Sequence, residues 1–146
     1  MSFEIRKAVL SDLGSAYRLD QVSFGKDAWT MMDYIGLFSF PGTEKFSAWV
    51  GGSFAGFAAS ELDKEENAVN LLTLAVSPEF RRQGIGASLL ARCEKAFGRY
   101  PVYLYVDAEN GPAIRLYRKA GYTQTDILRA YYMNGHDALV MEKSQV

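Results

Sequence analysis

The chain has 146 residues, enough for one domain with a buried core, and we expect residues 1–146 to form a single domain. Hydrophobic residues make up 49% of it and the net charge is −1, which argues against intrinsic disorder and against general nucleic-acid binding. The single cysteine argues against an internal disulfide, the charged N-terminal segment argues against a signal peptide, and the short apolar runs argue against a membrane span. We therefore expect a soluble, cytoplasmic monomer or homodimer without membrane contact.

The N-terminal half predicts two helices among strands. Ser11 is the expected N-cap of the first helix, and the second is expected to begin at Thr30. Two apolar runs on either side of Gly51 and Gly52 predict a β-hairpin, and an apolar run after a polar loop predicts a largely buried strand. The expected elements are a strand over 3–8, helices over 12–22 and 30–41, a hairpin over 45–62 and a strand over 68–76.

The C-terminal half changes to helical periodicity after Pro78. Apolar residues recur at every fourth position, which predicts a helix that ends at Gly98. This stripe consists of Ile85, Leu89, Cys93 and Phe97. A strand over 102–106, a helix over 111–120 and a hairpin over 130–143 that turns at Asn134-Gly135 are expected to follow. The order of elements predicts an α/β fold of the α+β type, a mixed sheet with helices on its faces.

The stretch "VSPEFRRQGIGASLL", residues 76–90, joins the buried strand to the striped helix and has two possible interpretations. A helix N-terminus preceded by glycines is suited to binding an anion, and Arg81 and Arg82 add positive charge. The same residues also fit an exposed basic turn, and their spacing does not decide between the two. A dinucleotide fingerprint would need glycine at Leu89, and a P-loop would need a Gly-Lys-Ser/Thr ending, so neither motif fits.

A resemblance to a known family favours the anion site. "LLTLAVSPEFRRQGIGASLL" resembles the acetyl-CoA motif of the GNAT acetyltransferases, whose Arg/Gln-x-x-Gly-x-Gly/Ala signature is matched by Arg81, Gly84 and Gly86. "VDAENGPAIRLYRKAGY" is similar to a second element of that family, at the family's separation. The matching residues there are Asn110, Ala113, Leu116, Tyr117, Gly121 and Tyr122. The resemblance implies the GNAT fold, a mostly antiparallel twisted sheet with helices on both faces, and an N-acetyltransferase that uses acetyl-CoA and no metal.

The outer segments resemble one group within the family, the N-terminal protein acetyltransferases, which include the bacterial ribosomal-protein alanine acetyltransferases. "IRKAVLSDL" resembles their first strand and helix, and "AYYMNGHDALVMEK" is similar to their C-terminal hairpin. "SFGKDAWT" resembles their Phe-x-x-x-Pro-Trp-Ser/Thr element, although Ala28 replaces the usual proline. The resemblance therefore implies a protein or peptide N-terminus as acceptor.

The resemblance also implies the cofactor contacts. Main-chain N–H groups would bind the pyrophosphate at the helix N-terminus, and the strand before it would pair with the pantetheine arm. The Val76 N–H would stabilise the oxyanion, and Tyr117 would protonate the thiolate that leaves when the amine attacks the thioester. Lys119 could add a phosphate contact. The full expected set is Leu74, Val76, Arg81, Arg82, Gln83, Gly84, Ile85, Gly86, Ala87, Asn110, Ala113 and Tyr117.

Five aromatic residues are the expected substrate contacts: Phe24, Trp29, Tyr105, Tyr131 and Tyr132. Several candidate residues also have a simpler structural interpretation. Aromatic residues pack in cores, Asn110 suits a turn before a helix, Arg82 suits a solvated surface, and Cys93 belongs to the apolar stripe. His136 is the only histidine, and we do not expect it to be the catalytic base because it lies at the predicted hairpin tip.

The sequence offers no clear general base. Some relatives carry Glu or His where this chain has Tyr105, and some carry one where it has Asn70; the remaining acidic candidates, Asp20, Glu61 and Asp107, match no motif. An α-amine has a pKa near 7.7–8.0, and lysine has a pKa near 10.4. At pH 7, deprotonation therefore costs about 1 kcal/mol for the α-amine and about 4.6 kcal/mol for lysine. A site without a strong base favours the α-amine.

Three functions remain open at this level. The first is an acetyltransferase that acts on protein or peptide N-termini, favoured by the predicted aromatic groove. The second is a GNAT enzyme that acetylates a small amine, such as a polyamine, an amino acid or an antibiotic, for which an acidic pocket near the thioester would be expected. The third is a non-catalytic module that binds acetyl-CoA, which the presence of Tyr117 disfavours.

Overall fold

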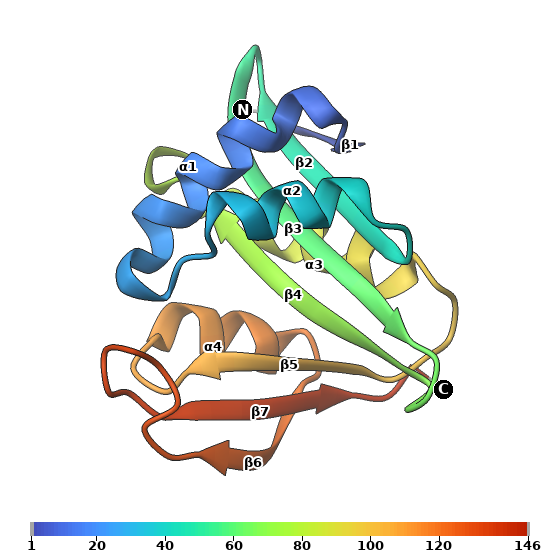
Figure 1. Cartoon of the computed structure of the whole chain (residues 1–146), viewed down its shortest axis with the longest axis vertical. Coiled ribbons are helices and arrows are strands. Elements are labelled where there is room, and N and C mark those ends of the chain that lie inside the picture. Colours follow the sequence, from blue (N-terminus) through green and yellow to red (C-terminus); the bar gives the residue numbers. More distant parts are fainter. Residues whose placement is uncertain (1, 146) are drawn as a thin grey trace.

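The computed structural model describes residues 2–145, in which a seven-stranded sheet carries helices on both faces (Figure 1). The strands are β1 (Glu4–Lys7), β2 (Thr43–Val50), β3 (Ser53–Asp63), β4 (Ala68–Val76), β5 (Val102–Asp107), β6 (Thr123–Leu128) and β7 (Ala138–Lys143). The α-helices are α1 (Leu13–Phe24), α2 (Met31–Ser39), α3 (Ile85–Lys95) and α4 (Gly111–Lys119), and short 3-10 helices are η1 (Leu10–Asp12), η2 (Gly25–Asp27) and η3 (Pro78–Phe80). None of the helices within residues 2–145 is long and apolar enough to cross a bilayer.

The sheet has the strand order β1-β2-β3-β4-β5-β7-β6 and is antiparallel except between β4 and β5. This parallel pair meets in register only at Val69–Val102 and Asn70–Tyr103. Beyond these residues the two strands diverge, so that the sheet opens in its middle (Figure 1). A bulge at Leu72 interrupts the pairing of β4 with β3, because Ala59 pairs with Thr73 and the next residue, Ser60, pairs with Leu71.

Two apolar cores cover the two faces of the sheet. Buried residues of α1 and α2 pack on Phe57, Ala59 and Ala75, whereas α3 and α4 pack with the larger core on the opposite face. Helix α3 lies very close to β3: a Cβ built on Gly56 would be 3.1 Å from Cδ1 of Leu89. A larger residue at position 56 would push the helix away from the sheet, which explains the glycine at this position.

Most predicted elements are confirmed. The hairpin turns at Gly51 and Gly52, β4 covers residues 68–76, and the Thr30 side chain caps α2 by accepting a 3.1 Å hydrogen bond from the Asp33 N–H. The N-cap predicted at Ser11 is wrong, because Ser11 lies inside η1 and α1 begins at Leu13. The polar side chain that fastens this turn is Asp12, which accepts a 2.9 Å hydrogen bond from the Val9 N–H.

The C-terminal hairpin is present, but its first strand lies earlier than predicted. β6 covers Thr123–Leu128, and residues 129–137 form the connection to β7, with the Asn134-Gly135 turn inside it. The sequence of β6 hides the strand because β6 is an edge strand with mostly exposed side chains and lacks the alternation of a half-buried strand. Tyr131 and Tyr132 therefore belong to a loop rather than to a strand.

Candidate active site

Two clefts lie along β4 where it diverges from β5. The larger one, which we name the α3–α4 cleft, has a volume of about 830 Å³ and is lined by the end of β4, the start of α3 and one face of α4. The smaller one, the tyrosine cleft, has a volume of about 550 Å³ and is lined by residues 70–72 of β4, residues 103–105 of β5, Asp27, Trp29, Tyr131 and Tyr132. The opening of the sheet thus provides two adjoining binding spaces.

The α3–α4 cleft brings together every expected cofactor contact except Gln83, which is not in its lining and whose side-chain oxygen is buried. The loop before α3 has left-handed backbone at Arg82 (φ 64°) and at Gly84 (φ 85°), which is the N-cap of α3. Glycine adopts this conformation without strain. The first N–H groups of α3 have no acceptor within the helix and lie at the wall of the cleft.

The charged side chains that line the α3–α4 cleft are all cationic. They are Arg81, Arg82, Arg115 and Lys119. Together with the positive end of the α3 dipole they make the cleft suited to an anion with several charges, such as a pyrophosphate. Arg81 also has a structural contact, since its Nε donates a 3.2 Å hydrogen bond to the carbonyl oxygen of Val76 and ties the loop to the end of β4.

Tyr117 projects from α4 into the α3–α4 cleft. The helix is capped by Asn110, whose Oδ1 accepts a 3.3 Å hydrogen bond from the Ala113 N–H. The ring of Tyr117 packs edge-on against Tyr122, and the residue is 6% exposed. Burial raises the pKa of Tyr117, with a further contribution from Tyr132 of the tyrosine cleft. No hydrogen bond among residues 2–145 engages the Tyr117 hydroxyl, so this protonated phenol is free to donate.

The tyrosine cleft contains four of the five aromatic residues expected to contact the substrate: Trp29, Tyr105, Tyr131 and Tyr132. Tyr131 stands edge-on to both Tyr105 and Tyr132, with centroid distances of 5.5 Å and 5.1 Å. The fifth residue, Phe24, lines the α3–α4 cleft instead. The chain turns at Gly25, where φ is 54°. Phe24, the last residue of α1, therefore lines the α3–α4 cleft, whereas Trp29, which follows η2, lines the tyrosine cleft.

Two side chains with polar groups in the tyrosine cleft, Asp27 and Tyr103, are not among the residues that the sequence predicts as substrate contacts. Tyr103 was detectable, because it lies two residues before Tyr105 on β5 and side chains two apart point to the same face of a strand. Asp27 had no such signal. It ends η2, a turn whose position depends on tertiary contacts rather than on a sequence period.

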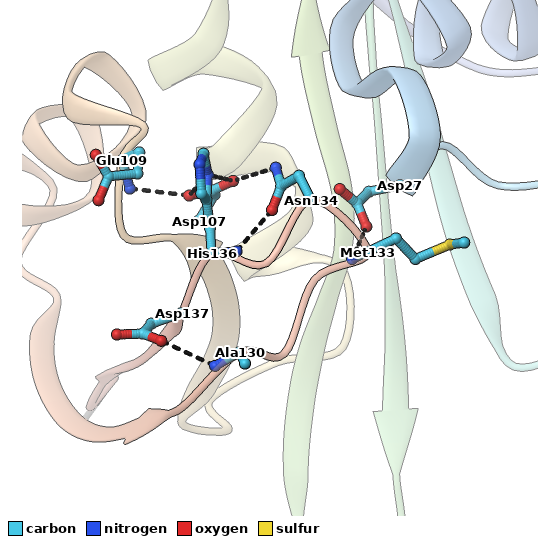
Figure 2. Close-up of polar contacts among 8 residues, drawn as sticks. All are labelled: Asp27, Asp107, Glu109, Ala130, Met133, Asn134, His136 and Asp137. Carbon is cyan, nitrogen blue, oxygen red and sulfur yellow. Dashed lines mark hydrogen bonds and ion pairs between the residues drawn. The ribbon is translucent and has the colours of Figure 1, made fainter.

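The loop 129–137 is held in place by carboxylates (Figure 2). Asp137 accepts a 2.8 Å hydrogen bond from the Ala130 N–H, and Asp27 accepts a 2.7 Å hydrogen bond from the Met133 N–H. Asp107, at the end of β5, binds Nδ1 of His136 at 2.9 Å and Nδ2 of Asn134 at 3.2 Å. Within the loop, the Tyr132 N–H donates a 3.1 Å hydrogen bond to the carbonyl oxygen of His136. Together these contacts position the loop that carries Tyr131 and Tyr132.

The three acidic candidates for the general base line neither cleft. Asp20 is buried and accepts hydrogen bonds from Trp29 N–H (2.7 Å) and from the Tyr34 hydroxyl (2.9 Å), and its burial raises its pKa. Glu61 lies on β3, and Asp107 is occupied by the loop contacts. Asn70 and Tyr105 stand at the two positions where some relatives carry Glu or His, and both side chains line the tyrosine cleft.

A family model described as the acetyltransferase (GNAT) family matches residues 11–122, which includes both halves of the α3–α4 cleft. The chain belongs to the GNAT acetyltransferase family. An N-alpha-acetyltransferase of Sulfurisphaera tokodaii is 41% identical over 76 residues, a stretch that spans 49% of this chain and 46% of that relative. The ribosomal-protein-S18-alanine N-acetyltransferase of Escherichia coli has a similar structure, with a TM-score of 0.85 and 27% identity over 99% of this chain and 94% of the other.

A second solved structure is informative because of what it contains. Arabidopsis thaliana Naa50 in complex with the bisubstrate analogue CoA-Ac-MVNAL has a TM-score of 0.84 to this GNAT chain and 27% identity, over 99% of each chain. In the present GNAT chain, the two family motifs face each other across one cleft: Gly84 and Gly86 at the start of α3, and Asn110 and Tyr117 on α4. Of the residues that line the adjoining tyrosine cleft, Leu71 and Leu72 at the start of the first motif are the ones that belong to either motif.

The Asp107–His136 pair of this GNAT acetyltransferase should be visible in a proton NMR titration. The hydrogen bond to Asp107 raises the pKa of His136 above 6.5. Burial alone would raise the pKa of Asp107, but hydrogen bonds from Glu109 N–H, His136 and Asn134 lower it below 3.8. Because His136 is the only histidine, its ring signal is unambiguous, and we expect its midpoint to move from above 6.5 towards 6.5 in Asp107→Asn.

The sign of the pH dependence follows from these two shifts. A raised histidine pKa contributes stability that is present below 6.5 and is lost as the pH rises through the raised value. A lowered carboxyl pKa contributes stability that is present above 3.8 and is lost as the pH falls through the lowered value. The pair therefore stabilises the loop most between pH 3.8 and 6.5. An unchanged His136 midpoint in Asp107→Asn would show that the contact does not form in solution.

Proposed function

We propose that this GNAT acetyltransferase transfers the acetyl group of acetyl-CoA to the N-terminal α-amino group of a protein or peptide. The observation that carries the proposal is the pair of adjoining clefts, an α3–α4 cleft lined by cations and an open tyrosine cleft large enough for the end of a chain. A relative and a structural neighbour named for N-terminal acetylation, together with the peptide-containing analogue bound to Naa50, support the same assignment.

The residues of the α3–α4 cleft fit acetyl-CoA. The N–H groups at the start of α3 would bind the pyrophosphate, and Arg82, Arg115 and Lys119 would meet the remaining phosphate charge. The edge of β4 at Leu74 and Val76 faces the opening of the sheet rather than β5, so its main-chain groups would pair with the amides of the pantetheine arm. The thioester of acetyl-CoA supplies the activated acetyl group.

The proposed roles of the protein groups follow from the negative charge that develops on the thioester oxygen and on the leaving sulfur during acetyl transfer. The α-amine nitrogen attacks the thioester carbonyl, the C–S bond breaks, and the sulfur leaves as a thiolate that takes a proton. Tyr117 is the proposed donor, because its hydroxyl is protonated, unengaged and at the wall of the cleft. The Val76 N–H is the proposed oxyanion donor. The ammonium proton is lost to water, which an α-amine permits at small cost at neutral pH.

A thiol-release assay with acetyl-CoA tests the proposal. The panel contains peptides with free N-termini, the same peptides blocked at the N-terminus but retaining a lysine, and small amines such as spermidine. We expect release with free N-termini and at least about 100-fold less with blocked peptides, because the lysine amine costs about 3.6 kcal/mol more to deprotonate at pH 7. Reaction of blocked peptides only, or of small amines only, would overturn the proposed acceptor.

A further inference from the structure

The two clefts carry opposite charges. The α3–α4 cleft is lined by arginine and lysine, whereas the tyrosine cleft has a single ionisable group of fixed charge at neutral pH among its lining side chains, the carboxylate of Asp27. We infer that the acceptor peptide carries a lysine or arginine side chain shortly after its N-terminal residue, and that Asp27 is the specificity-determining residue that recognises it. This inference rests on the proposed function and specifies its substrate class.

Asp27 lies in the wall of the tyrosine cleft, and one hydrogen bond orients its carboxylate. Its Oδ1 accepts the 2.7 Å hydrogen bond from the Met133 N–H, which links the α1–α2 connection to the loop 129–137 (Figure 2). Its Oδ2 makes no hydrogen bond within the described residues, and no lysine, arginine or histidine side chain there forms an ion pair with it. A fixed carboxylate with one free oxygen on a cleft wall is suited to a cation from outside the chain.

The other walls of the tyrosine cleft also favour a cation. Trp29, Tyr103, Tyr105, Tyr131 and Tyr132 surround the cleft with aromatic rings. The negative face of an aromatic ring attracts an ammonium or guanidinium group, by about 0.5–1 kcal/mol where the contact is exposed and by about 2 kcal/mol where it is desolvated. A neutral or acidic side chain would gain neither this attraction nor the ion pair.

The cation that Asp27 binds is a side chain rather than the reacting amine. The α-amine must lose its proton before it can attack, and a carboxylate beside it would stabilise the ammonium form and oppose that loss. A lysine or arginine side chain keeps its charge throughout the reaction, so the attraction to Asp27 contributes to binding in the ground state and in the transition state alike. We therefore expect the effect mainly in KM.

The test compares peptides that differ in charge but hardly in volume: arginine and its neutral isostere citrulline, placed in turn at positions 2, 3 and 4 behind a free N-terminal serine. For the native enzyme we expect kcat/KM to be about 10-fold higher with arginine at one of these positions, through KM. In Asp27→Asn, which retains an acceptor for the Met133 N–H, the ratio should fall to within about 2-fold. Asp126→Asn, on the exposed edge strand β6, is the matched control and should keep the native ratio.

The outcomes distinguish failure of the inference about Asp27 from failure of the proposed function. If all peptides with free N-termini react equally well regardless of charge, or if the preference for arginine persists in Asp27→Asn, the inference about Asp27 is wrong and the proposed function stands. If no peptide with a free N-terminus reacts, both are wrong. A preference for arginine that disappears in Asp27→Asn and remains in Asp126→Asn supports the inference.

Discussion

Replacing Tyr117 by phenylalanine should lower kcat by about 100-fold, the lower end of what a positioned general acid contributes. The substitution removes only the hydroxyl, which makes no hydrogen bond within residues 2–145, and it leaves the ring packed against Tyr122. The cleft should therefore keep its shape. We expect the Kd for acetyl-CoA, measured by calorimetry, to change by less than about 2-fold while kcat falls, which would place the hydroxyl in the chemical step.

Tyr122→Phe is the matched control. Tyr122 is the neighbour of Tyr117 in the same packed pair, but its hydroxyl donates a 2.8 Å hydrogen bond to Oε2 of Glu94 and lines neither cleft. Its loss should reduce the free energy of unfolding by about 1–3 kcal/mol, because the buried Glu94 carboxylate loses one of its donors while Lys143 Nζ remains at 3.2 Å, and should leave kcat nearly unchanged. Equal values of kcat in Tyr117→Phe and the native enzyme would exclude the acid role of Tyr117.

Asp20→Ala should be strongly destabilising. The Asp20 side chain is 1% exposed and accepts the Trp29 N–H and the Tyr34 hydroxyl, with Thr73 at 3.4 Å. Alanine would leave two buried donors without acceptors, at about 1–3 kcal/mol each. We expect the free energy of unfolding to fall by about 3 kcal/mol and Tm by about 10 °C. Thermal unfolding followed by circular dichroism measures both values.

The matched control is Asp63→Ala. Asp63 also accepts main-chain hydrogen bonds, from Glu65 and Glu66, but these lie in an exposed turn where water replaces the lost acceptor. Its removal should cost less than about 1 kcal/mol. If Asp20→Ala were no more destabilising than Asp63→Ala, the Asp20 network would not connect α1, Trp29 and β4 in the way the structure indicates.

The sequence predicts the parts of this fold whose burial leaves a clear apolar pattern. The apolar runs of the hairpin around Gly51 and Gly52 and of β4 reflect burial beneath helices on both faces of the sheet, and the stripe of α3 reflects burial of one helix face, so these elements can be predicted without tertiary information. The first strand of the C-terminal hairpin lies earlier than predicted because β6 is an exposed edge strand, and Ser11 is not the N-cap of α1 because a 3-10 turn precedes the helix. In both cases tertiary contacts, not local pattern, fix the geometry.

The same distinction holds for the candidate site. The glycines of the α3 loop, Asn110 and Tyr117 lie in contiguous motifs, and the fold places them around one cleft. The tyrosine cleft is assembled from four separate segments of the chain, so the match of "SFGKDAWT" to a family element does not tell which of its residues line this cleft: Asp27 and Trp29 do, and Phe24 does not. The membership of this cleft depends on how η2 and the loop 129–137 meet, through a hydrogen bond between residues 106 positions apart.

The short contact between β4 and β5 has a mechanical consequence. β4 and β5 pair at only two positions, so this short contact is, in the described part of the chain, the sole strand pairing between a half-sheet of β1 to β4 and a half-sheet of β5 to β7. Within each half-sheet the neighbouring strands pair over most of their length, so a change in the angle between the halves would break few main-chain hydrogen bonds. A ligand that bonds to the open edge of β4 while it contacts α4 would connect the two half-sheets. Amide hydrogen exchange would then slow in β4 and in β5 together.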